Sequence, residues 1–314
     1  MTAFELIHLH AGTAHVEIAP AIGGALAGYW TQTDQARLNW LRPLGAEANK
    51  VGDVLSTSSF PLVPFSNRIR DGRFSFAGRD VTLPLNFADH PHAIHGHGWQ
   101  SPWTIDAVGL NQASLSIEHR AGAWPWDYSA RQKFSLTPAG LTVELELTND
   151  SAHEMPAGLG FHPYFPRTPD TTVIAKVEAI WRTDEQVMPL YLETPGDGEN
   201  PLRGIRGDAV VLDNCFTGWN RRALIAWPER RAALTLTASQ MLDYVVLFTP
   251  AGEDFLCIEP VSHATDAFNM AAVGIANNGV RVLSPGQSWK VSMTLEPHRL
   301  ADGISPRSGR RANP

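Results

Sequence analysis

Two side chains that could act as acid and base are each surrounded by apolar residues. His162 lies in the segment GLGFHPYF, and Glu259 follows an apolar run that includes Phe255, Leu256 and Ile258. Burial shifts the pKa values of imidazole and carboxyl groups toward neutrality, which is what general acid and base catalysis requires. Taken alone, each of the two residues is more typical of a core position whose polar atoms are satisfied.

A second polar segment, PFSNRIRDGRF, concentrates hydrogen-bond donors. It holds Asn67, Arg68, Arg70 and Arg73. The planar fork of a guanidinium group suits carboxylates, phosphates and paired hydroxyls, so the segment is a candidate binding site. The alternative interpretation is a charged strand edge that discourages aggregation.

The third polar segment, HPHAIHGHGW, places His90, His92, His95 and His97 within eight residues. On an extended strand, residues i and i+2 share a face, so His90 with His92, or His95 with His97, could chelate one metal ion. No carboxylate or cysteine lies within the run to complete a mixed site. One or two catalytic or hydrogen-bonding histidines are favoured over a surface histidine loop, and no metal site is predicted.

Other chemical templates are missing from the sequence. We find no G-x-S-x-G, G-x-x-x-x-G-K-[ST], H-E-x-x-H or G-x-G-x-x-G pattern, so serine nucleophiles and nucleotide binding have no support. Cys215 and Cys257 are far apart in the chain and belong to no metal or disulfide pattern. We predict two buried thiols and no cofactor.

The elements that must position these residues are predicted to be strands. In GLTVELELTN, Leu141, Val143, Leu145 and Leu147 alternate with polar residues, which is typical of a half-buried strand. The same alternation occurs at Leu115 and Ile117, from Tyr128 to Leu136, at Leu234 and Leu236, and from Val291 to Leu295. The residues from Phe74 to Leu83 predict a hairpin with its turn at Gly78. No amphipathic helix exceeds two or three turns, which disfavours βα units and parallel sheets.

Composition bounds the class of protein. The 314 residues are 18% charged with a formal net charge of −7, which disfavours a disordered chain and a nucleic-acid partner. Glycine (26) and proline (23) exceed the roughly 38 residues that average usage would give, so many turns are expected. We predict an all-β protein with one large antiparallel sandwich over residues 1–304 and a flexible tail over residues 305–314.

Export and membrane insertion are not predicted. The N-terminus, MTAFELIHLH, has no basic region of a signal peptide. The uncharged stretch Ile18–Trp30 contains Pro20 and is well short of the roughly 20 apolar residues that span a bilayer. A cytoplasmic protein without a membrane partner is expected.

Five motifs in this sequence resemble those of the aldose 1-epimerase (galactose mutarotase) family. They are NRIRDGRF from Asn67, AIHGHGW from Ala93, GLGFHPYF from Gly158, VLDNCFTGW from Val211 and CIEPVSHATDAFN from Cys257, in the order and at about the spacing of the family. The resemblance implies a β-supersandwich fold and the interconversion of the α and β anomers of a free hexose without a cofactor. The implied partner is a small sugar, and the chain would be a monomer or a homodimer.

The resemblance also implies roles for individual residues. Glu259 matches the catalytic base, His162 the catalytic acid, and His95 the histidine that hydrogen-bonds the sugar near its ring oxygen. The remaining matches concern binding of the sugar: Asn67 and Arg68 form the Asn-Arg pair of the site, and Asp213 holds sugar hydroxyls. The chemistry agrees, because opening a hemiacetal ring needs a base at the C1 hydroxyl and an acid at the ring oxygen.

Two departures leave the substrate open. Many family members have a glutamine on the strand leading toward the glutamate, and the stretch VVLFTP from Val245 has none. Arg70 lies two residues after Arg68, and on a regular strand both guanidinium groups would face the site. The alternatives are therefore a mutarotase for an anionic sugar, such as a sulfonated or phosphorylated hexose, and a sugar-binding module without catalysis. Against the anionic-sugar alternative, Arg70 could instead pair with a surface carboxylate such as Asp71 or Asp80. Whether His97, Tyr164 or Trp219 contacts the ligand is left open.

Overall fold

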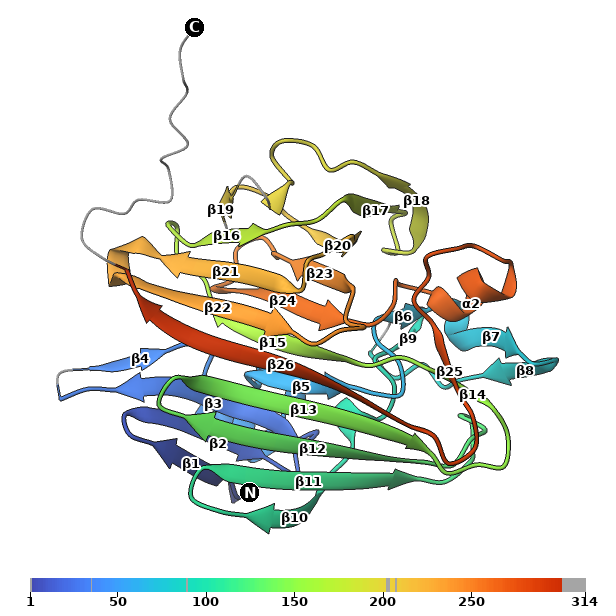
Figure 1. The fold of residues 1–314 in the computed structure, drawn as a ribbon, viewed down its shortest axis with the longest axis horizontal. Coiled ribbons are helices and arrows are strands. Elements are labelled where there is room, and N and C mark those ends of the chain that lie inside the picture. Colours follow the sequence, from blue (N-terminus) through green and yellow to red (C-terminus); the bar gives the residue numbers. More distant parts are fainter. Residues whose placement is uncertain (1, 35, 89, 202–203, 207, 301–314) are drawn as a thin grey trace, which may run out of the picture.

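Two large antiparallel sheets make up most of the protein (Figure 1). The structure, a computed structural model, describes residues 2–300 except residues 35, 89, 202, 203 and 207; the tail expected at 305–314 lies outside them. The all-β prediction is confirmed, and the predicted scarcity of long helices is confirmed for the described residues.

The first sheet has 11 strands and carries the candidate acid and base on its central strands. Its order is β1 (Ile7–Ala11), β2 (Ala14–Ala19), β3 (Ala25–Gln32), β5 (Ser59–Leu62), β15 (Gly160–Pro166), β24 (Phe255–Val261), β23 (Tyr244–Phe248), β20 (Asp213–Thr217), β17 (Ala179–Thr183) and β18 (Pro189–Glu193), with β4 (Arg37–Asn39) paired to β3.

The second sheet has nine strands and contains the segments whose alternation the sequence shows most clearly. Its order is β10 (Thr104–Val108), β11 (Gln112–His119), β12 (Tyr128–Thr137), β13 (Gly140–Asn149), β26 (Ser288–Arg299), β22 (Ala232–Ala238), β21 (Arg222–Trp227), β16 (Thr172–Ala175) and β19 (Ile205–Arg206). In β12 and β13, alternate residues are buried along the whole strand, as predicted.

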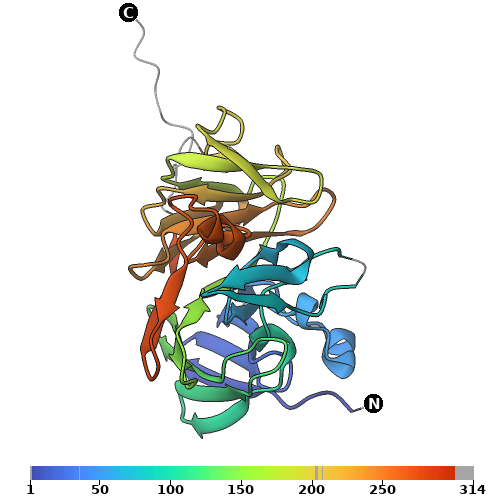
Figure 2. The ribbon, with the colours of Figure 1, turned by 90° about the vertical axis from the view of Figure 1, so that its right-hand side faces the viewer.

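Shorter elements close one end of the molecule, the end that faces the viewer in Figure 2. They include the two-stranded pairs β6 (Arg68–Ile69) with β9 (Ala93–Ile94), β7 (Arg73–Phe76) with β8 (Arg79–Thr82), and β14 (Met155–Ala157) with β25 (Arg281–Leu283), and helix α2 (Ala267–Ala272). Helix α1 (Ala46–Val51) is also short, and 3₁₀ turns occur at Val54–Ser56, Arg70–Gly72, Gly98–Gln100 and Pro228–Arg230. The predicted hairpin is β7–β8, whose turn places Gly78 at a φ of 76°.

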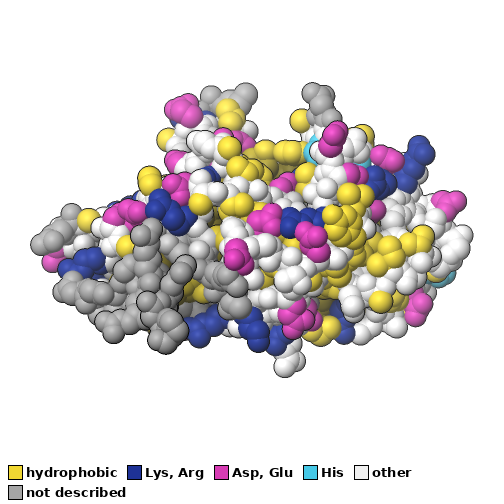
Figure 3. All heavy atoms as spheres, turned by 90° about the horizontal axis from the view of Figure 1, so that it is seen from above, with side chains coloured by type: hydrophobic (Ala, Val, Ile, Leu, Met, Phe, Trp, Pro, Cys, Tyr) yellow, Lys and Arg dark blue, Asp and Glu magenta, His cyan; other side chains and the backbone are white. Residues whose placement is uncertain are grey.

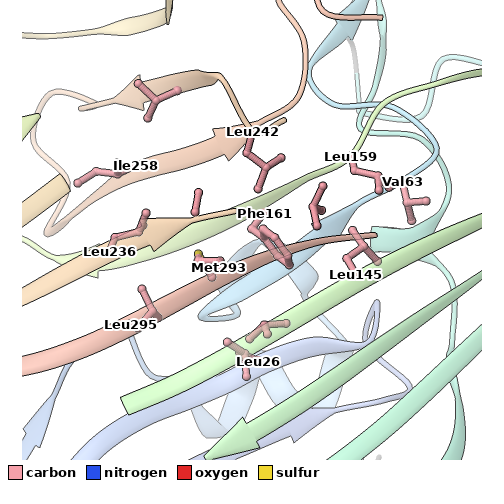
Figure 4. Close-up of a cluster of buried hydrophobic side chains, with 14 of the residues drawn as sticks. Leu26, Val63, Leu145, Leu159, Phe161, Leu236, Leu242, Ile258, Met293 and Leu295 are labelled. Carbon is pink, nitrogen blue, oxygen red and sulfur yellow. The ribbon is translucent and has the colours of Figure 1, made fainter. Parts of the chain in front are cut away.

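The main core lies between the two large sheets (Figure 4). Phe161 on β15 and Ile258 on β24 contribute from the first sheet, and Leu145, Met293 and Leu295 from the second. Successive side chains of a strand point to opposite faces, so the neighbours of Phe161 and Ile258 must lie on the outer face of the first sheet. Those neighbours are His162 and Glu259.

The outer face of the first sheet is itself partly covered by a second apolar cluster. It includes Phe60, Trp99, Tyr164, Val246 and Cys257, all buried. The central strands are therefore buried on both faces, which is why β15 and β24 show no alternation of exposed and buried residues.

The molecular surface mixes charges. On the face shown in Figure 3, basic side chains lie beside acidic ones, with hydrophobic side chains between them. None of the helices in the described part of the chain has the length and apolar character needed to cross a bilayer.

Candidate active site

Strand register brings the predicted acid and base together. β15 pairs with β24 so that Gly160 lies opposite Val261 and Tyr164 opposite Cys257, which puts His162 opposite Glu259 between them. Glu259 is in turn paired with Val246 on β23. His162 Nε2 lies 3.3 Å from Glu259 Oε1, and the two residues are 7% and 3% exposed. Two residues 97 positions apart in the sequence are thus in direct contact because adjacent strands carry them.

Burial sets the protonation of this pair. Removal from water lowers the pKa of His162, and the nearby guanidinium groups of Arg42 and Arg68 lower it further. The same desolvation raises the pKa of Glu259 well above its usual value, Asp213 adds to the rise, and Arg68 opposes it. The charged form of each group is disfavoured, so the pair holds one proton between the two side chains rather than two or none.

His95 has one ring nitrogen committed to the backbone. Its Nδ1 accepts a hydrogen bond from the Asn67 backbone N–H at 3.0 Å, so Nδ1 carries no proton and the neutral ring is protonated at Nε2. Burial lowers the pKa of His95 well below its usual value, and His162 and Arg68 add to the shift. The ring packs edge-on against His162, with ring centres 5.4 Å apart. His95 is therefore suited to donate a hydrogen bond at this site.

Asn67, Arg68 and Asp213 form a connected polar wall. Arg68 Nη2 donates to Asp213 Oδ2 at 3.0 Å, and Arg68 Nη1 donates to Asn67 Oδ1 at 3.1 Å. Arg68 Nε donates to His90 Nε2 at 3.2 Å, which holds the guanidinium plane in place. The Asp213 side chain remains 28% exposed, so its second oxygen is available to a ligand hydroxyl.

These residues line a cavity of about 380 Å³ on the outer face of the first sheet. Its lining combines polar and charged residues with aromatic and aliphatic ones. The lining is Arg42, Leu55, Phe60, Asn67, Arg68, Phe87, Ile94, His95, Trp99, His162, Tyr164, Asp213, Val246, Phe248, Pro250, Glu253, Phe255 and Glu259. A concave site with a few convergent polar groups on an apolar wall is typical of small-molecule binding.

The prediction that Arg70 could face this site is wrong. Strand β6 ends at Ile69, and the chain turns through a 3₁₀ turn in which Asp71 has a φ of 54°, so Arg68 and Arg70 do not share a strand face. Arg70 does not line the cavity; its guanidinium lies 3.4 Å from Asp184 and 3.8 Å from Asp266. Arg70 pairs with carboxylates, as the alternative interpretation expected, although Asp71 and Asp80 were the partners suggested there.

The histidine segment does not form the strand that chelation by neighbouring pairs would need. Strand β9 covers Ala93–Ile94 alone, and His95 has a φ of 60°, which breaks the alternation. His92 Nδ1 accepts from the Asp71 backbone N–H at 3.0 Å, and His97 stacks on His119 with ring centres 4.4 Å apart. His95 lines the cavity, whereas His97 and Trp219 do not.

One group of potential metal ligands does occur in the site. Donor atoms of His162, Cys257 and Glu259 all lie within 4.8 Å of one another. Burial raises the pKa of the Cys257 thiol well above its usual value, and Glu259 adds to the rise, so the sulfur stays protonated. A protonated thiol is a poor metal ligand, and the donor set fits an acid–base pair better than a metal centre.

The sequence analysis missed Arg42 and Phe60. Arg42 Nη2 donates to the backbone carbonyls of Leu55 and Thr57, and its guanidinium lies 3.9 Å from the Tyr164 ring centre. No local motif marks Arg42, because its partners come from other segments of the chain. Phe60 stands opposite His162 in the β5–β15 register and packs on its ring, with centres 4.6 Å apart. Knowledge of the strand pairing would have identified Phe60.

Comparisons with known proteins agree with the fold. The model of the aldose 1-epimerase family matches residues 5–296. The chain is 31% identical to the uncharacterized protein YphB of Escherichia coli (strain K12) over 310 residues, which cover 94% of this chain and 98% of that protein.

Solved structures are similar over almost their whole length. A crystal structure of a putative aldose 1-epimerase from Escherichia coli K12 matches with a TM-score of 0.85 and 30% identity, covering 94% of this chain and 99% of the other. A galactose mutarotase-like protein from Clostridium acetobutylicum shares the fold with a TM-score of 0.84 at 19% identity, covering 93% and 95% of the two chains. Because the family model spans nearly the whole chain, this protein belongs to the aldose 1-epimerase family.

Proposed function

We propose that this protein is a mutarotase that interconverts the α and β anomers of a neutral free hexose. The observation that carries the proposal is the buried His162–Glu259 contact of 3.3 Å at the wall of the cavity. The C1 hydroxyl oxygen and the ring oxygen of a hexose are bonded to the same carbon. An acid and a base in contact with each other can therefore reach the two oxygens at the same time.

The proton pathway follows from that geometry. The pair acts in the less populated form that has its one proton on His162. The Glu259 carboxylate then takes the proton of the C1 hydroxyl while His162 gives its proton to the ring oxygen, and the bond between C1 and the ring oxygen breaks. Rotation about the C1–C2 bond presents the other face of the aldehyde. Closure with the two roles reversed returns both protons and yields the other anomer. His95, protonated at Nε2, donates to an oxygen near the reacting centre, and Asp213 with Arg68 holds the hydroxyls.

A neutral sugar is proposed because the two guanidinium groups at the cavity already have partners. Arg68 donates to Asp213, Asn67 and His90, and Arg42 donates to backbone carbonyls. An anionic substituent at Arg68 would have to compete with the Asp213 carboxylate. We expect kcat/KM for glucose or galactose to exceed that for a hexose 6-phosphate at least tenfold, measured by NMR exchange between anomers. A preference for the phosphorylated sugar would contradict this assignment.

The test of catalysis is the exchange rate of anomers in polarimetry after subtraction of the spontaneous rate. Glu259→Gln and His162→Asn each remove a proton-transfer group and are expected to lower kcat by roughly 10²–10⁴-fold. Glu185→Gln, an exposed residue that does not line the cavity, is the matched control and should retain the wild-type rate. Undiminished exchange in Glu259→Gln would remove Glu259 from the catalytic role, and a wild type that binds sugar without exchange above the spontaneous rate would be a binding module.

A further inference from the structure

A cluster of histidines lies on the first sheet, outside the candidate active site. The outer face of the β1–β2 hairpin carries His8 and His10 on β1 and His15 and Glu17 on β2. His10 is paired across the strands with His15, and His8 with Glu17. None of these residues lines the cavity of the active site.

The first observation is the approach of two ring nitrogens. His15 Nδ1 and His8 Nε2 lie 3.2 Å apart, and the two ring planes differ by 6°. Two imidazole nitrogens bound to one tetrahedral zinc ion at about 2.0–2.1 Å would be about 3.3 Å apart. An ion bound to both nitrogens would replace the hydrogen bond that now joins the rings, and each ring would turn about its side-chain bonds so that its lone pair points at the ion.

The second observation is the supply of further ligands. The ring centre of His10 lies 6.3 Å from that of His8 and 6.2 Å from that of His15. His10 is exposed, so a change of rotamer brings its ring to the same ion without disturbing packing. Glu17 is on the same face and can supply a carboxylate oxygen. Three imidazoles with an oxygen ligand suit Zn²⁺, Ni²⁺ and Cu²⁺.

The third observation is that a neighbouring cation is already engaged elsewhere. The guanidinium of Arg37 lies 3.7 Å over the Trp30 ring and donates to Asn39.

We propose that His8, His10 and His15 form a binding site for a divalent transition-metal ion on the outer face of the β1–β2 hairpin. The site is separate from the mutarotase chemistry. Zn²⁺ is the ion used to test it, and Cu²⁺ serves as an optical probe because the ring centre of Trp30 lies 5.3 Å from that of His15.

The binding test is calorimetric titration of the full-length protein with Zn²⁺ at pH 7.5. We expect one saturable site in the wild type, at least a tenfold weaker affinity in His8→Ala and in His15→Ala, and a smaller loss in His10→Ala. His153→Ala removes an exposed histidine elsewhere and should bind as the wild type does. Circular dichroism confirms that each variant folds. Equal affinity in all variants, or no saturable site, would overturn the proposal.

The location test is quenching of tryptophan fluorescence by Cu²⁺. Wild type should lose a fraction of its emission that Trp30→Phe does not lose, and His15→Ala should abolish that component. At saturating Zn²⁺ the rate of anomer exchange should stay at its initial value, since the cluster does not line the catalytic cavity. If Zn²⁺ instead inhibits exchange and binding is lost in His162→Asn, the ion occupies the active site and the proposal is wrong.

Discussion

Catalysis at the residue scale depends on one proton shared by His162 and Glu259. Burial lowers the pKa of the histidine and raises that of the glutamate. These shifts favour the neutral pair, with the proton on Glu259, over the ion pair that the ordinary pKa values would favour. Mutarotation uses both forms, because each group must be an acid in one half of the turnover and a base in the other.

The pH profile of kcat/KM tests this arrangement. We expect a bell-shaped profile, because the pair is inactive with two protons and inactive with none. A second proton must go onto the buried imidazole, whose pKa is lowered, so the acid limb should lie below the ordinary histidine value of about 6.5. The measurement is polarimetry from pH 4 to 10 with the spontaneous rate subtracted. An acid limb centred at or above pH 6.5 would contradict the prediction, and so would a rate with no alkaline limb.

The hydrogen bond from the Asn67 backbone N–H fixes the tautomer of the His95 ring. Because Nδ1 accepts from the backbone, the ring presents a donor at Nε2. The amide nitrogen of glutamine can occupy a similar position, whereas leucine offers no donor. We expect His95→Gln to retain a larger fraction of kcat than His95→Leu, with leucine costing roughly 10²–10³-fold. Equal losses in the two variants, with thermal stability unchanged, would show that the ring acts by shape alone.

At the scale of elements, a strand could be predicted from sequence where its apolar and polar residues alternate, and the strands that carry the site do not show this alternation. Strands β12 and β13 face the core on one side, so their sequences alternate and could be predicted. Strands β15 and β24 are buried on both faces, so the direction of His162 and Glu259 depends on a register that no local pattern shows. The motifs that resemble the family identified these residues, but their contact follows only from the pairing of the strands.

At Arg70, a strand periodicity expected from the sequence does not continue in the structure. Its predicted direction assumed that strand periodicity continues past Arg68, and the chain leaves the strand at Ile69 instead. Asp71 adopts a left-handed backbone, and the Arg70 backbone N–H is held by Asp266 at 3.0 Å. The residue that holds the backbone where the strand ends is 196 positions away, and local sequence contains no sign of this contact.

The loop that carries His95 depends on a glycine. Gly96 has a φ of 72°, and a Cβ atom there would lie 2.3 Å from the carbonyl oxygen of Val63. That oxygen also accepts hydrogen bonds from the backbone N–H groups of His97 and Gly98. Gly96→Ala should therefore lower the free energy of unfolding by about 2–4 kcal/mol and reduce kcat/KM by displacing His95. Urea unfolding and anomer exchange measure the two effects.

Gly78→Ala is the matched control for that substitution. Gly78 also has a positive φ, of 76°, but nothing lies within 4 Å of the Cβ position. Its cost should be limited to the backbone strain, about 1 kcal/mol, with activity unchanged. A Gly96→Ala protein as stable and active as Gly78→Ala would mean that the loop moves away from Val63 without consequence.

For the whole molecule, composition and periodicity were sufficient to predict a large antiparallel sandwich. The pairing order was beyond them, because strands such as β5, β15 and β24 meet across long stretches of chain. The same strand order removes several histidines from water, and the sequence alone does not show which of them are buried. His263 is buried and His97 is half-buried. Burial lowers the pKa of each to about 4, with His119 adding to the shift at His97 and a backbone hydrogen bond opposing it at His263.

Because the pKa values of His97 and His263 are lowered, we expect the folded protein to lose stability in mild acid. A histidine in the unfolded chain binds a proton below about pH 6.5, whereas His97 and His263 in the folded protein do so only near pH 4, so the unfolded state holds more protons in this window. Each of the two therefore removes about 1.4 kcal/mol from the free energy of unfolding per pH unit between those values. The raised pKa of Glu259 acts in the opposite direction, because the folded state takes up a proton there first. We expect the midpoint of urea unfolding to fall from pH 7 to pH 5.5, and His97→Phe, which keeps a ring to stack on His119, to fall by less. His153→Gln, at an exposed position, should follow the wild type; a midpoint independent of pH in this range would show that the histidines titrate alike in both states.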